Sequence, residues 1–184
     1  MGSTRICGNS DEGEENCYSE ALIYNCENNV TINGAKFVGG IAGEVQTTIY
    51  SAKNNGIVRG NSYVGGILGV APVCAIHNVV NSGNVEANED FVGGIVGNII
   101  MGSLTSTQNF ANVTTSGGYV GGLVGLSGTY FIAHYCANMG NVSSTMPEAQ
   151  IGGLVGEFGD PKDWKFSDTF RLVLSSTGAI FGSI

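Results

Sequence analysis

The chain has 184 residues, of which 30 are glycine and 12% are charged, and its formal net charge is −8. That length is enough for a single domain with a sizeable core. Binding to phosphate backbones or anionic membranes needs basic patches, and no Lys or Arg lies between Arg59 and Lys162. The composition therefore argues against nucleic acid and against membrane surfaces as partners.

The N-terminal segment, residues 1–22, carries no clear repeat and holds an acidic cluster between Asp11 and Glu15. We expect this segment to be a polar cap, because the cluster lacks the spaced oxygen ligands of a calcium-binding loop. No apolar run long enough for a signal peptide or a membrane helix follows Met1. Cys7 and Cys17 are the one plausible disulfide pair, and free thiols remain the alternative.

From residue 23 onward one phrase recurs: an aromatic or polar residue, Val-Gly-Gly or Ile-Gly-Gly, an aliphatic pair and a third glycine. The first glycines of the copies are Gly39, Gly65, Gly93, Gly121 and Gly152, followed by a degraded sixth copy at Gly178. Their spacings are 26, 28, 28, 31 and 26 residues. Such a period indicates stacked supersecondary units, with approximate limits at 23–46, 47–73, 74–102, 103–128, 129–159 and 160–184.

Two further columns precede each glycine pair. One is apolar and consists of Val30, Val58, Val85, Val113 and Val142. The other is an asparagine column, Asn28, Asn54, Asn81 and Asn138, which Ala111 interrupts in the fourth copy. Stacked asparagines hydrogen-bond to one another and tolerate left-handed corners. We expect this column to be structural, and the alternative is a ligand-binding ladder.

The repeat length decides the architecture. No window shows a helical period, whereas short runs rich in Val, Ile and Leu are frequent. A propeller blade needs about 40–45 residues, but three short strands with three corners fit the observed period. The sequence therefore predicts an all-β fold, a parallel β-helix or β-solenoid of about six coils with 26–31 residues per coil. The expected interior ladder is Ile41, Ile67, Ile95, Leu123 and Leu154.

The repeat resembles a known family. Asn-Ser-Gly-Asn-Val at 81–85, followed by Phe-Val-Gly-Gly-Ile-Val-Gly at 91–97, is similar to the GLUG repeat. The resemblance runs from about Asn25 to Gly156. It implies a secreted or surface-anchored microbial protein, as in adhesins and the non-catalytic parts of immunoglobulin A proteases. It brings no catalytic residue with it.

Motifs that carry enzyme chemistry are missing from the sequence. There is no His-Glu-x-x-His, no Gly-x-Ser-x-Gly and no phosphate loop with its lysine. The five cysteines lack zinc-site spacing. Cys26 and Cys136 share a column but stand four coils apart, about 19 Å at the spacing of β-strands. We therefore predict that the protein is not an enzyme and has no catalytic residue, cofactor or metal site.

One column combines aromatic and polar side chains and is the candidate exposed surface. Its members are Tyr24, Tyr50, His77, Thr107 and His134. The two histidines are separated by two coils, about 10 Å, which is too far to share a metal. This column is either an ordinary solvent-facing stripe or a functional surface.

Two functions from different classes follow. The first is an extracellular or cell-surface repeat module, which binds a host glycan or protein like an adhesin or acts as a rigid spacer. The second is a structural subunit that stacks on copies of itself through exposed coil ends into filaments. The apolar run at 170–174 and the segment 178–184 motivate this alternative. A fragment of a longer protein would end at a repeat boundary in the same way.

Overall fold

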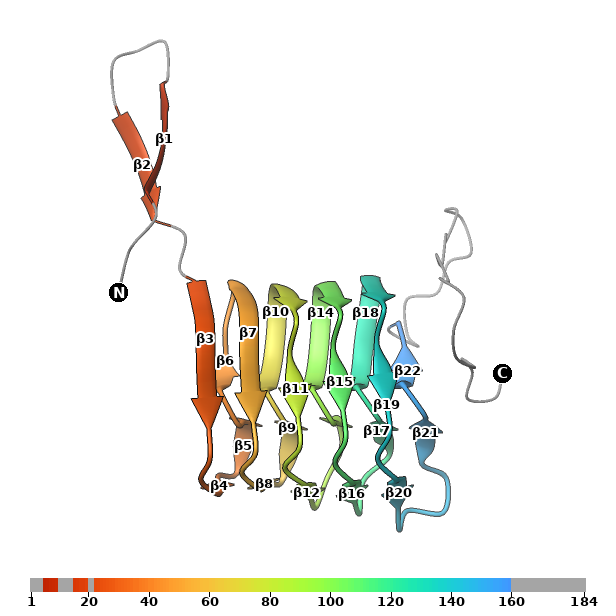
Figure 1. Cartoon of the computed structure of the whole chain (residues 1–184). Helices are drawn as coiled ribbons and strands as arrows, with labels where there is room; N and C mark the ends of the chain where they lie inside the picture. The colour runs from red at the N-terminus through yellow and green to blue at the C-terminus, as the bar shows by residue number, and fades with distance from the viewer. Residues whose placement is uncertain (1–4, 10–14, 20–21, 160–184) are drawn as a thin grey trace, which may run out of the picture.

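The computed structural model describes residues 5–9, 15–19 and 22–159. Figure 1 shows a row of coils stacked side by side, which begins at β3 and ends at β22. The strands of this stack pair in parallel, each with the strand at the same place in the next coil. The predicted all-β parallel solenoid is confirmed, with about five turns in place of six. The sixth predicted repeat, 160–184, lies outside the described residues.

Each turn is built from short strands separated by corners. The first turn contains β3 (Leu22–Asn28), β4 (Ile32–Asn33), β5 (Lys36–Gly39) and β6 (Ala42–Glu44). The second contains β7 (Thr48–Asn54), β8 (Val58–Gly60), β9 (Ser62–Gly65) and the long β10 (Leu68–His77). The third contains β11 (Val80–Asn81), β12 (Val85–Ala87), β13 (Val92–Gly93) and β14 (Val96–Thr105). The fourth contains β15 (Gln108–Asn109), β16 (Val113–Thr115), β17 (Tyr119–Gly121) and β18 (Val124–His134). The fifth contains β19 (Ala137–Asn138), β20 (Val142–Ser144), β21 (Gln150–Gly152) and β22 (Val155–Phe158).

Three parallel sheets run along the stack. One has ten strands and includes β7, β10, β14 and β18; the two others have five strands each, β4 to β20 and β5 to β21. The N-terminal strands β1 (Arg5–Asn9) and β2 (Glu15–Ser19) form a separate antiparallel sheet. Within the described residues no helix is long and apolar enough to cross a membrane. That residues 1–22 act as a cap stays a prediction.

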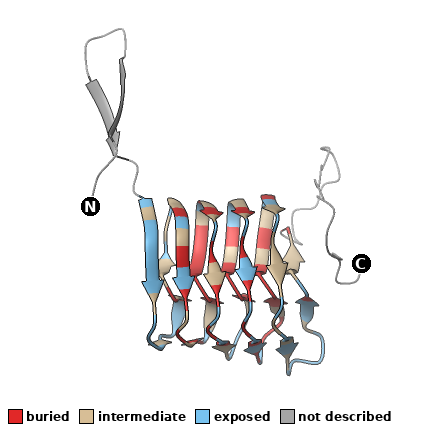
Figure 2. Ribbon diagram, viewed as in Figure 1, coloured by how far each residue is buried: buried red, intermediate tan, exposed pale blue. Residues whose placement is uncertain are grey.

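The interior contains two ladders of apolar side chains. The aliphatic ladder predicted from the repeat is present, since Ile67, Ile95 and Leu123 are at most 1% exposed. A second cluster, Val58, Val64, Val85, Val92, Val113 and Val120, is fully buried. Figure 2 shows that buried residues concentrate in the middle turns and exposed ones in the first turn. Burial therefore depends on having a neighbouring turn on both sides.

An uninterrupted asparagine ladder runs through the stack. Its members are Asn28, Asn54, Asn81, Asn109 and Asn138. From Asn28 to Asn109, each Nδ2 donates to the Oδ1 of the next asparagine over 2.7–2.9 Å. Each Nδ2 of the ladder also donates to a carbonyl two residues ahead, as Asn81 does to Gly83. The predicted interruption at Ala111 is wrong, because Asn109 fills that place. The structural interpretation of the column is confirmed, since the amides bond to one another and to the corner backbone.

The apolar column begins two residues later than predicted. Ile32, not Val30, pairs with Val58, and Val30 is 64% exposed. The reason lies in the asparagine ladder, which is followed by the apolar residue at a constant spacing of four, as from Asn28 to Ile32. Val30 instead lies in the corner, where its carbonyl accepts the Asn28 amide.

The glycine pairs make room for neighbouring turns. The sheet register places Gly39, Gly65, Gly93, Gly121 and Gly152 in one line. A Cβ on Gly93 would collide with the Val96 carbonyl and lie 2.7 Å from that of Leu123. A Cβ on the second glycine, Gly94, would lie 2.5 Å from the Asn109 side chain. The pair therefore lets backbone and asparagine ladder approach closely. The predicted sixth member, Gly178, lies outside the described residues.

Candidate binding surface

The predicted exposed column lies on the ten-stranded sheet, with one correction. The register aligns Tyr24, Tyr50, His77, Thr105 and His134. Thr107 was the predicted fourth member and is fully buried. The fourth repeat lies two residues earlier than the predicted alignment, so Thr105 takes the place of Thr107 just as Asn109 takes the place of Ala111.

The aromatic residues of this column stack at its N-terminal end. Tyr24 and Tyr50 are nearly parallel with ring centroids 5.7 Å apart, and Tyr50 and His77 are 6.2 Å apart. Both tyrosines are exposed, at 60% and 43%. No group of three or more His, Cys, Asp and Glu side chains in the described residues could hold a metal ion. The column therefore offers ring contacts and hydrogen bonds.

Exposed apolar side chains accompany this column on the same sheet. Val73, Met101 and Tyr130 align across β10, β14 and β18, and all three are exposed, with Tyr130 at 75%. Ile132, two residues beyond Tyr130, is also exposed. Sequence reasoning missed this patch, although the alternation of buried and exposed residues along the long strands could have revealed it.

A second aromatic ladder lies where the repeated glycine phrase begins. Phe37, Tyr63, Phe91 and Tyr119 follow one another with ring centroids 5.1, 4.6 and 5.1 Å apart. The first three have positive φ angles of 56°, 55° and 67°, a region that bulky residues rarely occupy. Such strain persists only where the surrounding structure holds the backbone. The corner is therefore fixed by its neighbours, and the ring positions with it.

A shallow groove of about 620 Å³ lies beside this ladder. It crosses all five turns, with Lys36 contributed by the first, Tyr63 by the second, Asp90 by the third, Gly117 by the fourth and Met146 after β20 in the fifth. Side chains with hydrogen-bonding groups line it as well: Ser62, Asn88, Glu89 and Ser116. The groove thus combines ring edges, hydroxyl groups, an amide and charges of both signs.

Charges in and around the groove are partly used by the protein itself. The Lys36 ammonium lies 4.9 Å from the Phe37 ring centroid and 5.2 Å from that of Tyr63. An Asp90 carboxylate oxygen accepts a hydrogen bond from the Gly118 amide. Burial, and then the charges of Glu157 and Asp90, raise the pKa of Tyr119 above its ordinary value. Its phenol therefore stays protonated and neutral at physiological pH.

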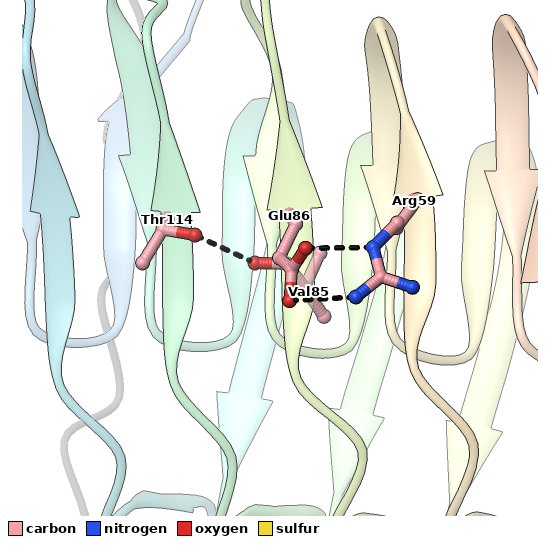
Figure 3. Close-up of polar contacts among 4 residues, drawn as sticks. All are labelled: Arg59, Val85, Glu86 and Thr114. Carbon is pink, nitrogen blue, oxygen red and sulfur yellow. Dashed lines mark hydrogen bonds and ion pairs between the residues drawn. The ribbon is translucent and has the colours of Figure 1, made fainter. Parts of the chain in front are cut away.

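Figure 3 shows polar contacts of Arg59, Glu86 and Thr114 between neighbouring strands β8, β12 and β16 of one five-stranded sheet. The Arg59 Nε lies 2.7 Å from the Glu86 Oε2, and both side chains are close to half exposed. Thr114 donates from its hydroxyl to the Val85 carbonyl over 3.5 Å. Arg59 is thus paired with Glu86, and residues 60–161 contain no Lys or Arg.

The three cysteines of the solenoid differ in exposure. Cys74 is buried, and its Sγ donates to the Thr47 carbonyl over 2.7 Å. Burial raises the pKa of the Cys74 thiol to about 11, against smaller opposing effects of backbone hydrogen bonds. Burial also raises the pKa of Cys136. A thiol with a raised pKa is a poor nucleophile, whereas Cys26 in the first turn is exposed.

No protein-family model matches the chain, nor does any curated protein. A solved structure does, a putative immunoglobulin A1 protease from Bacteroides ovatus, with a TM-score of 0.61 and 23% sequence identity. The match covers 83% of this chain and 51% of that one. The chain thus spans about half the length of its structural neighbour. At this level of identity the likeness establishes a shared β-solenoid fold, and nothing about activity.

Proposed function

We propose that the chain is a non-catalytic repeat module of an extracellular or cell-surface protein, which binds a host glycan through the groove beside Phe37, Tyr63, Phe91 and Tyr119. The observation that carries this proposal is the groove itself, which crosses five turns and combines rings with hydrogen-bonding side chains. Binding sites of this kind unite apolar surface with a few well-placed polar groups. The extracellular or cell-surface location is supported by the resemblance to GLUG repeats, which implies a secreted or surface-anchored protein.

The chemistry of the groove favours a glycan over an anionic ligand or a peptide strand. Hydroxyl groups of a sugar can donate to Glu89 and Asp90 and can accept from Ser62 and Ser116. An anionic chain would meet two carboxylates against the single ammonium of Lys36. A peptide that adds a strand needs a free backbone edge, and the strands beside the groove, such as β9 and β13, are paired on both sides.

A glycan array tests the proposal, with variants that separate the groove from the scaffold. The double variant Ser62→Ala with Glu89→Gln removes one hydroxyl and replaces one carboxylate by a neutral amide, and neither side chain makes a hydrogen bond among the described contacts. At about 0.5–1.5 kcal/mol for the lost hydroxyl bond, and a similar loss where a charged acceptor becomes neutral, binding should weaken by about tenfold. The matched control, Glu44→Gln with Ser103→Ala, changes the same chemistry on the ten-stranded sheet and should leave binding unchanged.

Two outcomes would overturn this binding site. If the protein binds no glycan on the array, the glycan-binding proposal fails and the spacer role remains for the repeat module, because a stack of laddered turns is a stiff rod whatever its surface binds. If both double variants weaken binding equally, the ligand does not lie in the groove. Unchanged thermal unfolding of all variants is the control for folding.

Self-assembly is the second candidate, and the direction of the asparagine ladder favours it. Each amide donates toward the next turn, so within the described residues Asn28 receives no amide from a preceding turn. The β3 edge likewise pairs only with β7 there. An open parallel edge can template another chain. Light scattering across a dilution series tests this, and particles that stay monomeric at every concentration would exclude filaments.

A further inference from the structure

The N-terminal hairpin brings two cysteines to one place in its ladder. β1 and β2 pair over five positions, and Cys7 stands opposite Cys17 at the middle one. Ile6 opposite Tyr18 and Gly8 opposite Asn16 flank this pair. The cysteines are ten positions apart in the chain, so the antiparallel register, and not their proximity in sequence, places them together.

The hairpin needs a source of stability other than the solenoid sheets. β1 and β2 form a two-stranded sheet of their own, which no strand of the solenoid joins. An isolated two-stranded hairpin is marginally stable in water. Directly opposite residues of an antiparallel pair have Cβ atoms about 4.5–5.5 Å apart, and a disulfide needs about 3.5–4.5 Å. The directly opposed register of Cys7 and Cys17 is therefore one in which a disulfide can form.

The remaining cysteines offer no better partner. The Cys74 thiol is buried and donates to the Thr47 carbonyl. Cys26 and Cys136 belong to the first and fifth turns, about 19 Å apart at the strand spacing. Cys26 is exposed, which makes it the one competitor for Cys7 or Cys17.

We propose that Cys7 and Cys17 form a disulfide that staples the N-terminal hairpin. The thiolate of one cysteine attacks a small-molecule disulfide, such as oxidised glutathione, and displaces one glutathione thiolate. The second cysteine, as thiolate, then attacks the mixed disulfide and displaces the other. One disulfide bond forms in the protein, the oxidant's disulfide is broken, and the two cysteine protons pass through solvent to the two displaced glutathione thiolates, which become thiols. Only the supply of oxidant in the organism rests on the proposed extracellular location.

Thiol counting by mass spectrometry tests the disulfide. The whole chain is equilibrated with oxidised glutathione or with dithiothreitol, denatured, alkylated and digested at glutamate. Cleavage after Glu12 and Glu15 separates Cys7 from Cys17. We expect alkylation of all five cysteines after reduction, and after oxidation a loss of two alkylated sites with one linked peptide pair. Cys7→Ser and Cys17→Ser should abolish that pair, and the matched control Cys26→Ser should keep it.

Three results would overturn the proposal: five alkylated cysteines after oxidation, a link from Cys7 or Cys17 to Cys26, or a link between two chains. The same oxidation in concentrated urea tests the role of the hairpin. We expect the linked pair to form several-fold more slowly there, and equal rates would show that the register does not direct it. Because oxidation is carried out in vitro, its failure is independent of the glycan array, whose failure leaves the disulfide intact.

Discussion

The third turn and the first turn carry the same types of side chain in the same ladders, but these side chains are buried in the third turn and partly exposed in the first. Ile95 is fully buried, while Ile41 in the first turn is partly exposed. Asn81 and Asn28 differ in the same way. The difference shows that a turn has little interior of its own. Its stability comes from contacts with the turn on each side, as expected for a one-dimensional repeat array.

Truncation in the aliphatic ladder should give the largest contrast between these turns. Ile95→Ala removes a fully buried side chain from the middle of the stack, and should lower the free energy of unfolding by about 2–5 kcal/mol. Ile41→Ala should lower it by less than half as much, because part of that side chain already contacts water. Urea unfolding measures both. Equal losses would show that the first turn is as well covered as the third.

The second glycine of the repeated phrase gives a contrast at the other end. Gly94→Ala places a Cβ 2.5 Å from the Asn109 side chain, and such overpacking costs about 1–3 kcal/mol. At Gly153, the matching position of the last described turn, a Cβ would meet no atom of the described residues within 4 Å. Gly153→Ala should therefore be nearly neutral in thermal unfolding. A large loss at Gly153 would instead indicate that another turn covers this end.

The asparagine ladder should show the same gradient. Asn81→Ala breaks its bonds to Asn54, Asn109 and Gly83, and leaves buried groups unpaired at about 1–3 kcal/mol. Asn28→Ala removes a bond to one neighbouring turn only, and should cost about 1 kcal/mol. Asn→Asp at either position keeps the volume, loses the donor and adds a negative charge, so it should cost more at the fully buried Asn81 than at Asn28. If Asn28→Ala and Asn81→Ala were equal, coupling between turns would not govern the ladder.

The fold could be predicted from the sequence because one phrase recurs at nearly constant spacing, and identical columns must stack. The errors arose where the sequence offered two choices. In the fourth repeat the predicted alignment puts Ala111 in the asparagine column, whereas Asn109 fills it, and β14 and β18 pair with a register shift between Ile99 and Met101. In the first repeat both Val30 and Ile32 follow Asn28 and could belong to the apolar column. Ile32 belongs to it, and Val30, which is closer to Asn28 in sequence, lies exposed in the corner.

The groove could not be predicted from the repeat. Lys36, Ser62 and Asp90 each directly precede the first residue of the phrase, but the segment before that residue differs in length between turns, and Met146 has no counterpart that sequence alone would align. The aromatic ladder could be predicted, because its members are the first residue of each copy of the phrase. Their positive φ angles could not be predicted. Those angles depend on contacts between turns, which a single repeat does not contain.

The smallest expected effect concerns the ion pair between the second and third turns. Arg59 and Glu86 are both close to half exposed, and exposed pairs contribute about 0–1 kcal/mol because water and salt screen them. Glu86→Gln should lower the free energy of unfolding by about 0.5 kcal/mol at low salt, and the difference should vanish in 1 M salt. Arg59→Gln in the Glu86→Gln background separates the pair from each residue alone. A coupling energy as large as the asparagine losses would mean that surface charge, and not the ladders, sets the strength of contact between turns.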